Sequence, residues 1–293
     1  MRATQKRWVA RGFGAALLAF LLSAGGGCDG NRDSSSSGSA APPASAALEA
    51  IRARGVLRIA VYTDKPPFGY VDSEGGNQGY DIELARRLAK DFFGDENKVN
   101  FVPTDPQSRI DLLNSGNVDI MLANFTRTPE RAEQVDFALP YMKTGIGVVS
   151  PKSAPIAAIE DLRGKKLAVV KGTTAESWLT RNHPDIQRVS FDHNTAAFNA
   201  LEKGHAAGLA HDNTLLYAWI TKNATFAVAL DWFGGDDVIA PAVKKGDADL
   251  LNWLNGEIRQ LYAEKFFFED YDKSLRPFYG QDIDPANIVI SNE

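Results

Sequence analysis

The stretch that decides the fold is Asn124-Phe125-Thr126-Arg127-Thr128-Pro129-Glu130-Arg131. It follows an apolar run, 118–123, that is short enough to be a buried strand. The residues from Thr128 onward read as a helix start, with a threonine cap, a proline at the first helical position and an acid in the first turn. The predicted order is therefore strand, polar turn and helix N-terminus.

This turn has two interpretations. Its hydroxyl groups and Arg131 lie where free backbone N–H groups favour an anion. The planar guanidinium of Arg131 can hold a carboxylate by two parallel hydrogen bonds, which a lysine cannot do. An ordinary capped helix with a surface arginine is the alternative, and the turn taken alone favours that simpler interpretation.

The N-terminal residues indicate export. Four basic residues precede an apolar segment at about 13–22 that is too short to span a membrane, so we expect a signal peptide at 1–27. Cys28 is the only cysteine, which excludes an internal disulfide. Its position is typical of a lipoprotein, with Cys28 lipidated, although Gly25 stands where such sites usually have leucine. Ordinary cleavage near 24–27 is the alternative.

By resemblance to lipoprotein sorting, Asp29 favours the inner membrane, so we expect a periplasmic domain anchored there through Cys28. The segment 28–47 is rich in serine, alanine and proline and predicts a flexible linker. About 245 residues remain for one large or two small lobes.

The composition argues against several classes of protein. The chain has 32 basic and 37 acidic residues, and the export segment takes away only basic ones, whereas nucleic-acid binders are more often basic. No glycine-rich phosphate loop and no metal pair at ligand spacing is present, so we expect neither a cofactor nor a metal. His211 is expected to be a strand-end residue rather than a ligand.

Strands and helices alternate along the chain, which predicts an α/β fold with mainly parallel sheets. The sequence of 112–120 resembles that of 200–208, and two similar α/β lobes explain this internal similarity. The expected strands are 56–61, 99–102, 118–123, 167–170 and 207–210. The expected helices are 80–93, 109–114, one from 172–174 to just before Pro184, 194–201 and 212–219.

Three polar turns follow strand ends, at the sheet edge where α/β proteins bind ligands. The first offers Thr126 and Arg131, and the second places Thr173 and Thr174 at a helix start that also suits an anion. The third offers Asp212, which suits a cation. Each residue of the second and third turns is also a plausible helix cap, but together the turns complement a zwitterionic α-amino acid.

The chain resembles the family 3 extracellular solute-binding proteins, the polar amino-acid receptors of ABC importers. The resemblance covers nearly all of 50–290 and rests on segments that occur in the family's order: 62–70, 79–85, 126–131, 135–141, 169–174 and 210–212.

The resemblance implies a role for each site residue. Arg131 and Thr174 would hold the ligand carboxylate, while Asp212, Thr126 and the Asn124 backbone would hold its ammonium group, with Thr173 beside them. Phe68 or Tyr70 would form a wall of the pocket.

The end that recognises the ligand side chain differs among subclasses. Lys65 and Arg109 are the candidates, with a solvated surface charge as the alternative for each. Arg109 resembles the arginine of aspartate and glutamate receptors, whereas 64–70, 94–99, 132–137, 211–216 and 238–247 are closer to periplasmic cysteine receptors. A cationic pocket can favour a thiolate, and cysteine therefore ranks above the acidic amino acids.

The resemblance also implies a mechanism. The chain would cross between lobes near 144–148 and 234–239, giving lobe I as 48–144 plus 239–293 and lobe II as 145–238. Ligand binding would close this hinge, and the closed monomer would dock on an inner-membrane permease.

Two other functions stay open. A periplasmic dehydratase shares the fold, but its catalytic glutamate would fall on Ala175, with Glu176 one residue late. The second open function is that of an adhesin or signalling receptor without a role in transport.

Overall fold

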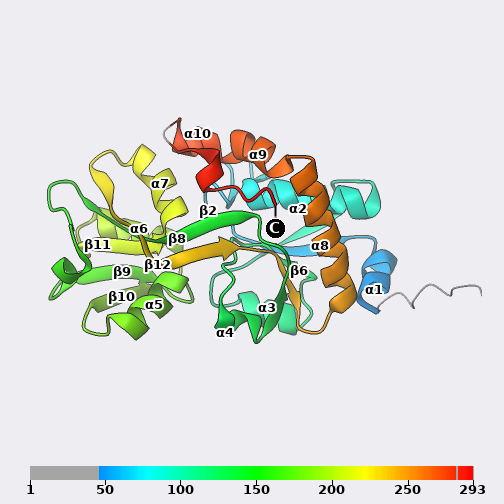
Figure 1. Cartoon of the computed structure of the whole chain (residues 1–293), viewed down its shortest axis with the longest axis horizontal. Helices are drawn as coiled ribbons and strands as arrows, with labels where there is room; N and C mark the ends of the chain where they lie inside the picture. Colours follow the sequence, from blue (N-terminus) through cyan, green and yellow to red (C-terminus); the bar gives the residue numbers. More distant parts are fainter. Residues whose placement is uncertain (1–45, 282, 293) are drawn as a thin grey trace, which may run out of the picture. The chain divides into compact units, whose positions relative to one another are not determined.

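The computed structural model describes residues 46–281 and 283–292. The predicted signal peptide, the lipidation at Cys28 and nearly all of the predicted linker lie outside these residues. Two five-stranded sheets organise the described chain, and helices flank both (Figure 1). We call the part around the first sheet lobe I and the part around the second sheet lobe II.

The sheet of lobe I has the strand order β5-β1-β6-β13-β7. β1 pairs in parallel with β5 and β6, while β13 pairs antiparallel with β6 and β7. The strands are β1 (Leu57–Val61), β5 (Val99–Pro103), β6 (Ile120–Met121), β7 (Val135–Phe137) and β13 (Ala242–Lys244). A small antiparallel sheet beside it consists of β2 (Asp64–Lys65), β3 (Gly69–Val71) and β4 (Asn77–Gln78).

The sheet of lobe II has the order β10-β9-β11-β8-β12. β9 pairs in parallel with β10 and β11, and β8 pairs antiparallel with β11 and β12. The strands are β8 (Met142–Pro151), β9 (Lys166–Val170), β10 (Gln187–Phe191), β11 (Gly208–Asp212) and β12 (Phe226–Ile239).

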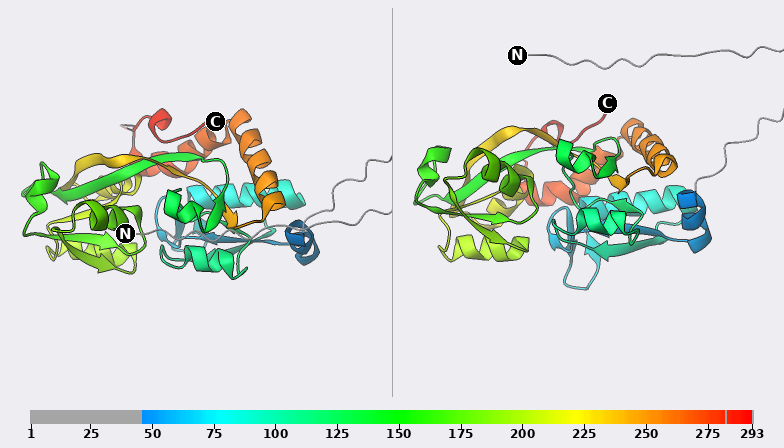
Figure 2. Two further views of the ribbon diagram at one scale, coloured as in Figure 1. Left: turned by 60° about the horizontal axis from the view of Figure 1, so that its bottom comes forward. Right: turned by 90° about the horizontal axis from the view of Figure 1, so that it is seen from below.

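The long strands β8 and β12 connect the two lobes. They run side by side from lobe II toward lobe I in every view (Figures 1 and 2). Their ends reach lobe I through backbone bridges of Met142 with Val289 and of Ile239 with Thr126. The predicted two-lobed fold with a two-strand hinge is confirmed, and the exact lobe boundaries at 144/145 and 238/239 remain a prediction within these strands.

The helices flank the two sheets and follow the predicted alternation. α2 buries Ile82, Ala85 and Leu88 and ends at Gly94, whose φ of 77° suits glycine. The helices are α1 (Ala46–Arg54), α2 (Tyr80–Phe93), α3 (Arg109–Asn114), α4 (Pro129–Ala132), α5 (Thr174–Asn182), α6 (Asn194–Glu202), α7 (Asn213–Lys222), α8 (Ala248–Ala263), α9 (Phe266–Asp270) and α10 (Arg276–Tyr279).

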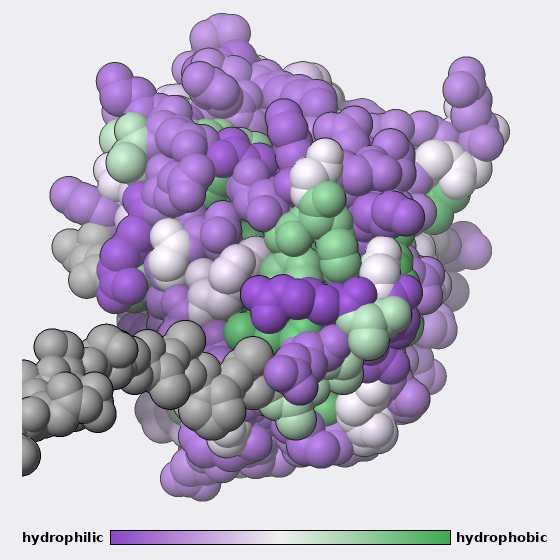
Figure 3. Space-filling model, turned by 90° about the vertical axis from the view of Figure 1, so that its right-hand side faces the viewer, coloured by the Kyte–Doolittle hydropathy of each residue, from purple (hydrophilic) through white to green (hydrophobic). Residues whose placement is uncertain are grey.

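The surface and the helices fit an ordinary globular domain. The face in Figure 3 is mainly hydrophilic, and its main apolar area lies near the centre. Among the described residues, the exposed large hydrophobic side chains are Val71 and Trp232. No helix in 46–281 or 283–292 is long and apolar enough to cross a membrane.

Candidate functional site

The predicted polar turns meet in one small cavity between the lobes. Its lining comprises Tyr62, Lys65, Arg109, Asn124, Thr126, Arg131, Thr173, Thr174, His211 and Asp212. The cavity measures about 10 Å³, room for about one water molecule. A larger groove of about 1240 Å³ lies beside β12, but the small cavity collects the buried charged groups and is therefore the candidate site.

The first turn has a strained and firmly held backbone. Ala123 and Asn124 have φ values of 42° and 43°, in the left-handed region. The N–H of Asn124 donates to Asp81 at 2.6 Å, and the hydroxyl of Tyr141 donates to the other oxygen of Asp81 at 2.6 Å. Burial raises the pKa of Asp81 to about 6. Asp81 could not be predicted as part of this turn from the sequence, because an acid in the first turn of a helix is usually exposed.

Arg131 is partly buried, and its guanidinium reaches from lobe I to lobe II. α4 begins at Pro129, as predicted, and the hydroxyl of Thr128 accepts from the N–H of Arg131 at 3.3 Å. The Arg131 guanidinium donates to the carbonyl of Thr126 at 2.7 Å and to that of Gly172, in lobe II, at 2.9 Å. Burial, together with the charge of Arg109, lowers the pKa of Arg131 to about 9.

Arg109 belongs to the same cluster and is not a surface charge. Only 3% of it is exposed. It donates to the carbonyl of Ala123 and to the carbonyl of Gly172, both at 3.2 Å. Its guanidinium lies 4.5 Å from the centre of the Phe125 ring. Arg109 and Arg131 of lobe I thus share one carbonyl acceptor in lobe II.

Lys65 lines the cavity and is not a surface charge. It is 2% exposed, and its ammonium donates to Asp212 at 2.7 Å and to Asn124 Oδ1 at 2.6 Å. Burial lowers the pKa of Lys65, while Asp212 acts in the opposite direction. Burial would raise the pKa of Asp212, but the Lys65 ammonium holds it well below its usual value. The ion pair of Lys65 and Asp212 joins the two lobes, and Lys65 thus reaches the acid that was expected to receive the ligand ammonium.

The second turn supplies both a cap and a free hydroxyl. Thr173 Oγ1 donates to the carbonyl of Val170 at 2.6 Å and accepts from the N–H of Glu176 at 3.3 Å, so Thr173 caps α5. In the described part of the chain, the hydroxyls of Thr174 and Thr126 have no hydrogen-bonding partner, although both residues line the cavity. These two hydroxyls remain available to a ligand.

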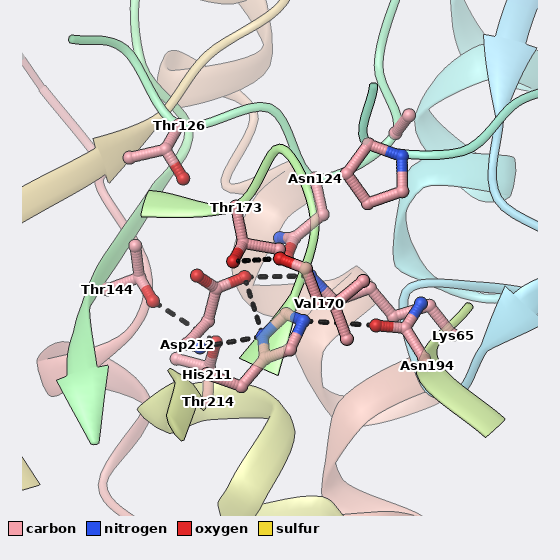
Figure 4. A network of polar contacts seen from close by, with 12 residues as sticks. Lys65, Asn124, Thr126, Thr144, Val170, Thr173, Asn194, His211, Asp212 and Thr214 are labelled. Atoms are coloured by element: carbon pink, nitrogen blue, oxygen red, sulfur yellow. Dashed lines mark hydrogen bonds and ion pairs between the residues drawn. The ribbon is translucent and has the colours of Figure 1, made fainter. Parts of the chain in front are cut away.

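His211 lines the cavity and connects it to a second contact between the lobes. Its Nδ1 accepts from the N–H of Asp212 at 2.7 Å, so Nε2 carries the proton and donates to Asn194 at 3.0 Å (Figure 4). Burial lowers the pKa of His211, consistent with the neutral ring. Asn194 donates in turn to Asp64 at 3.3 Å. The neighbours Asp64 and Lys65 of β2 therefore both contact this network in lobe II.

Neither of the two aromatic residues predicted to form a wall lines this cavity. Phe68 is fully buried, and its ring centre lies 5.5 Å from the Lys65 ammonium, so Phe68 lies next to a residue that lines the cavity. Tyr70 does not line the cavity, because its ring packs against Phe278 at 5.9 Å. Tyr62 lines it instead, with its ring centre 5.3 Å from the Lys65 ammonium. The available signal was its position directly after β1.

Residues 57–276 match the model of the bacterial extracellular solute-binding proteins, family 3. The chain belongs to this family. The resemblance noted from the sequence is thereby confirmed. Family 3 proteins are extracellular receptors for solutes, in agreement with a cavity that lies between two lobes.

Solved structures and curated relatives agree with this membership. The solute receptor for L-cysteine of Neisseria gonorrhoeae has 50% sequence identity and a TM-score of 0.82, over 83% of this chain and 99% of the receptor. The cysteine-binding protein of Campylobacter jejuni has 49% identity and a TM-score of 0.82, over 84% of this chain and 99% of that protein. An ABC transporter glutamine-binding protein of Bacillus subtilis is 31% identical over 231 residues, 78% of this chain and 84% of the relative.

Proposed function

We propose that this family 3 receptor captures a small polar L-amino acid, cysteine in preference to others, and delivers it to an ABC permease. The observation that carries the proposal is that Arg131 of lobe I and Asp212 of lobe II line one buried cavity. A guanidinium and a carboxylate held at opposite sides of a cavity complement the two charges of an α-amino acid.

The free hydrogen-bonding groups support a specific orientation of the ligand. Arg131 has five N–H donors and uses only some of them on carbonyls, so it can also bind the ligand carboxylate, together with Thr174. Lys65 contacts Oδ2 of Asp212, whereas Oδ1 has no partner in the described chain. The ligand ammonium would bind Oδ1 and the hydroxyl of Thr126.

The charge of the cavity favours an anionic ligand side chain. Arg131, Arg109 and Lys65 face a single lining acid, Asp212. A zwitterion adds no net charge, so a thiolate or a second carboxylate would balance the excess of cations. The two cysteine-binding relatives are similar over nearly their whole length, which supports cysteine. Aspartate or glutamate is the alternative.

A dehydratase-type enzyme on the same fold is less well supported. Ala175 stands where that chemistry would need a glutamate. The carboxylate of Glu176 is already occupied, since it accepts from the N–H of Gly172 at 2.9 Å and from the hydroxyl of Ser190 at 2.8 Å. The named relatives are receptors. We therefore infer a binding role and not a catalytic one.

Closure and anchoring complete the proposal. Contacts of Arg131 with Gly172 and of Lys65 with Asp212 form only when the lobes meet, so ligand affinity would be coupled to closure. Lipidation of Cys28 would keep the receptor at the periplasmic face of the inner membrane, near its permease. Mass spectrometry of the mature N-terminus tests this part, and an unmodified Cys28 would remove the tether.

Calorimetry with the twenty amino acids, including reduced cysteine, tests the function. We expect one tight ligand class, headed by cysteine. Arg131→Ala should weaken that binding by several kcal/mol, because it leaves the buried ligand carboxylate without its main donor. Arg127→Ala is the matched control, since Arg127 lies in the same turn but does not line the cavity. Undiminished binding by Arg131→Ala would reject the site, and no binding of any amino acid by the wild type would reject the function.

A further inference from the structure

Asn124 presents a buried hydrogen-bond donor that the protein leaves without a partner. The residue is 1% exposed, and its Nδ2 makes no hydrogen bond in the described part of the chain. The assignment of the two amide atoms is fixed by Lys65, whose ammonium lies 2.6 Å from the other one. An ammonium group only donates, so the atom beside it must be Oδ1, and the atom without a partner is the N–H donor.

The backbone holds this donor in place. Asn124 has a φ of 43°, and its own N–H is tied to Asp81 at 2.6 Å. In Figure 4 the Asn124 amide extends from its turn toward Thr173 and Asp212 of the opposite lobe. Asn124 also lines the cavity. The donor is therefore aimed into the space that a ligand would enter.

No acceptor of the described chain is bonded to Nδ2, although Asp212 Oδ1 and the Thr126 and Thr174 hydroxyls line the same cavity. Asp212 Oδ2 accepts from Lys65, and Thr173 Oγ1 accepts from the N–H of Glu176 while it donates to Val170. The ligand ammonium cannot be the partner of Nδ2, since it is a donor as well. The partner that suits Nδ2 is an acceptor on the ligand, and the ammonium of Lys65, 2.6 Å from the same amide, favours a negative one.

We propose that the Asn124 amide and the Lys65 ammonium form the subsite that recognises an anionic hydrogen-bond acceptor on the ligand side chain, a thiolate or a carboxylate. This inference rests on the proposed function. It gives the Asn124 side chain a role in selectivity, beside the backbone contact with the ligand ammonium that the family resemblance implies.

The test is the preference among three ligands of similar size. L-cysteine and L-aspartate carry an acceptor, whereas L-α-aminobutyrate has a methyl group in place of the thiol. Calorimetry on the wild type should show cysteine or aspartate binding at least tenfold more tightly than α-aminobutyrate. Whichever of the two binds more tightly identifies the acceptor as thiolate or carboxylate.

Asn124→Asp tests the role of the Nδ2 donor by removing it. Aspartate tolerates the left-handed backbone and keeps an oxygen toward Lys65, but it replaces the N–H donor by an acceptor. The preference over α-aminobutyrate should fall below about threefold. Asn100→Asp, on the exposed edge strand β5, adds the same charge away from the cavity and should leave the preference unchanged.

Asn124→Gly keeps the inference open to refutation if the aspartate variant does not fold. Glycine accepts the same φ and removes the donor, so it should abolish the preference as well. Equal wild-type affinity for all three ligands, or a preference that survives in the folded variants, overturns the inference and leaves the proposed function standing. A wild type that binds no amino acid overturns both.

Discussion

Lys65→Met removes the only lysine ammonium in the cavity and keeps most of the side chain's apolar stem. The stem packs near the rings of Tyr62 and Phe68, which lie 5.3 and 5.5 Å from the ammonium, and methionine can fill the same space. The variant therefore tests the charge of Lys65 with little disturbance of packing. Its direct effect falls on Asp212, which is 4% exposed.

The magnitude follows from the burial of the pair. Breaking a buried ion pair by removing one partner costs about 3 to 5 kcal/mol, because the remaining charge is left uncompensated. Asp212 lies in lobe II and Lys65 in lobe I, so opening of the lobes restores water to Asp212 and avoids this cost. We expect the closed population of the ligand-free protein to fall by more than about a hundredfold, with little loss of global stability.

Small-angle X-ray scattering of protein freed of ligand by unfolding and refolding measures this shift. Ligand-free Lys65→Met should have a larger radius of gyration than the wild type, and saturating ligand should bring both to the same value. Lys171→Met is the matched control, because Lys171 pairs with Asp192 at 2.8 Å within lobe II and the pair is exposed. Equal radii for the ligand-free wild type and Lys65→Met would refute the reasoning.

Two further substitutions test the turns on either side of the cavity. The pKa of Asp81 is raised from 3.8 to about 6, so the folded state binds this proton more tightly than the unfolded state, and the wild type should lose about 2 kcal/mol of stability between pH 4 and pH 6. Asp81→Asn should lack this loss in urea unfolding, and parallel pH profiles would contradict the raised pKa. In Gly172→Ala, the new Cβ would lie 2.9 Å from the backbone of Pro106 in lobe I, so calorimetry should show ligand affinity falling more than tenfold. Gly164→Ala is the control. The φ of Gly164 is 73° and that of Gly172 is 74°, but a Cβ at Gly164 would have no neighbour within 4 Å, so this variant should lower the melting temperature similarly while leaving ligand affinity intact.

Local sequence patterns predicted several of the helices and strands, because each of these forms within one continuous segment of the chain. The helix 80–93 was predicted with the bounds that α2 has, since its apolar spacing and Gly94 mark both its face and its end. The strand 118–123 was predicted too long, because β6 pairs only over Ile120–Met121 before the turn bends into the left-handed region. β10 has no counterpart in the prediction. It is an edge strand without a fully buried residue, so its pattern lacks a strong apolar signal.

Specific side-chain contacts between segments far apart in the sequence could not be predicted from local patterns. The turns at Thr126, Thr174 and Asp212 were predicted to converge because strand ends share one sheet edge. The contact of Lys65 with Asp212 joins residues 147 positions apart and different lobes, and no local pattern specifies it. The same is true of Asp81, whose burial comes from Tyr141, 60 residues away.

The charge distribution links closure to selectivity. Lobe I contributes the cations of Lys65, Arg109 and Arg131, and lobe II contributes Asp212. Closure therefore brings opposite charges together, but it also confines a surplus of positive charge, and the lowered pKa of Arg131 reflects burial and the repulsion from Arg109. A ligand with an anionic side chain removes this surplus, whereas a neutral one leaves the cations to oppose closure. Under the proposed function, the ligand charge that the site selects is thus the same quantity that stabilises the closed form.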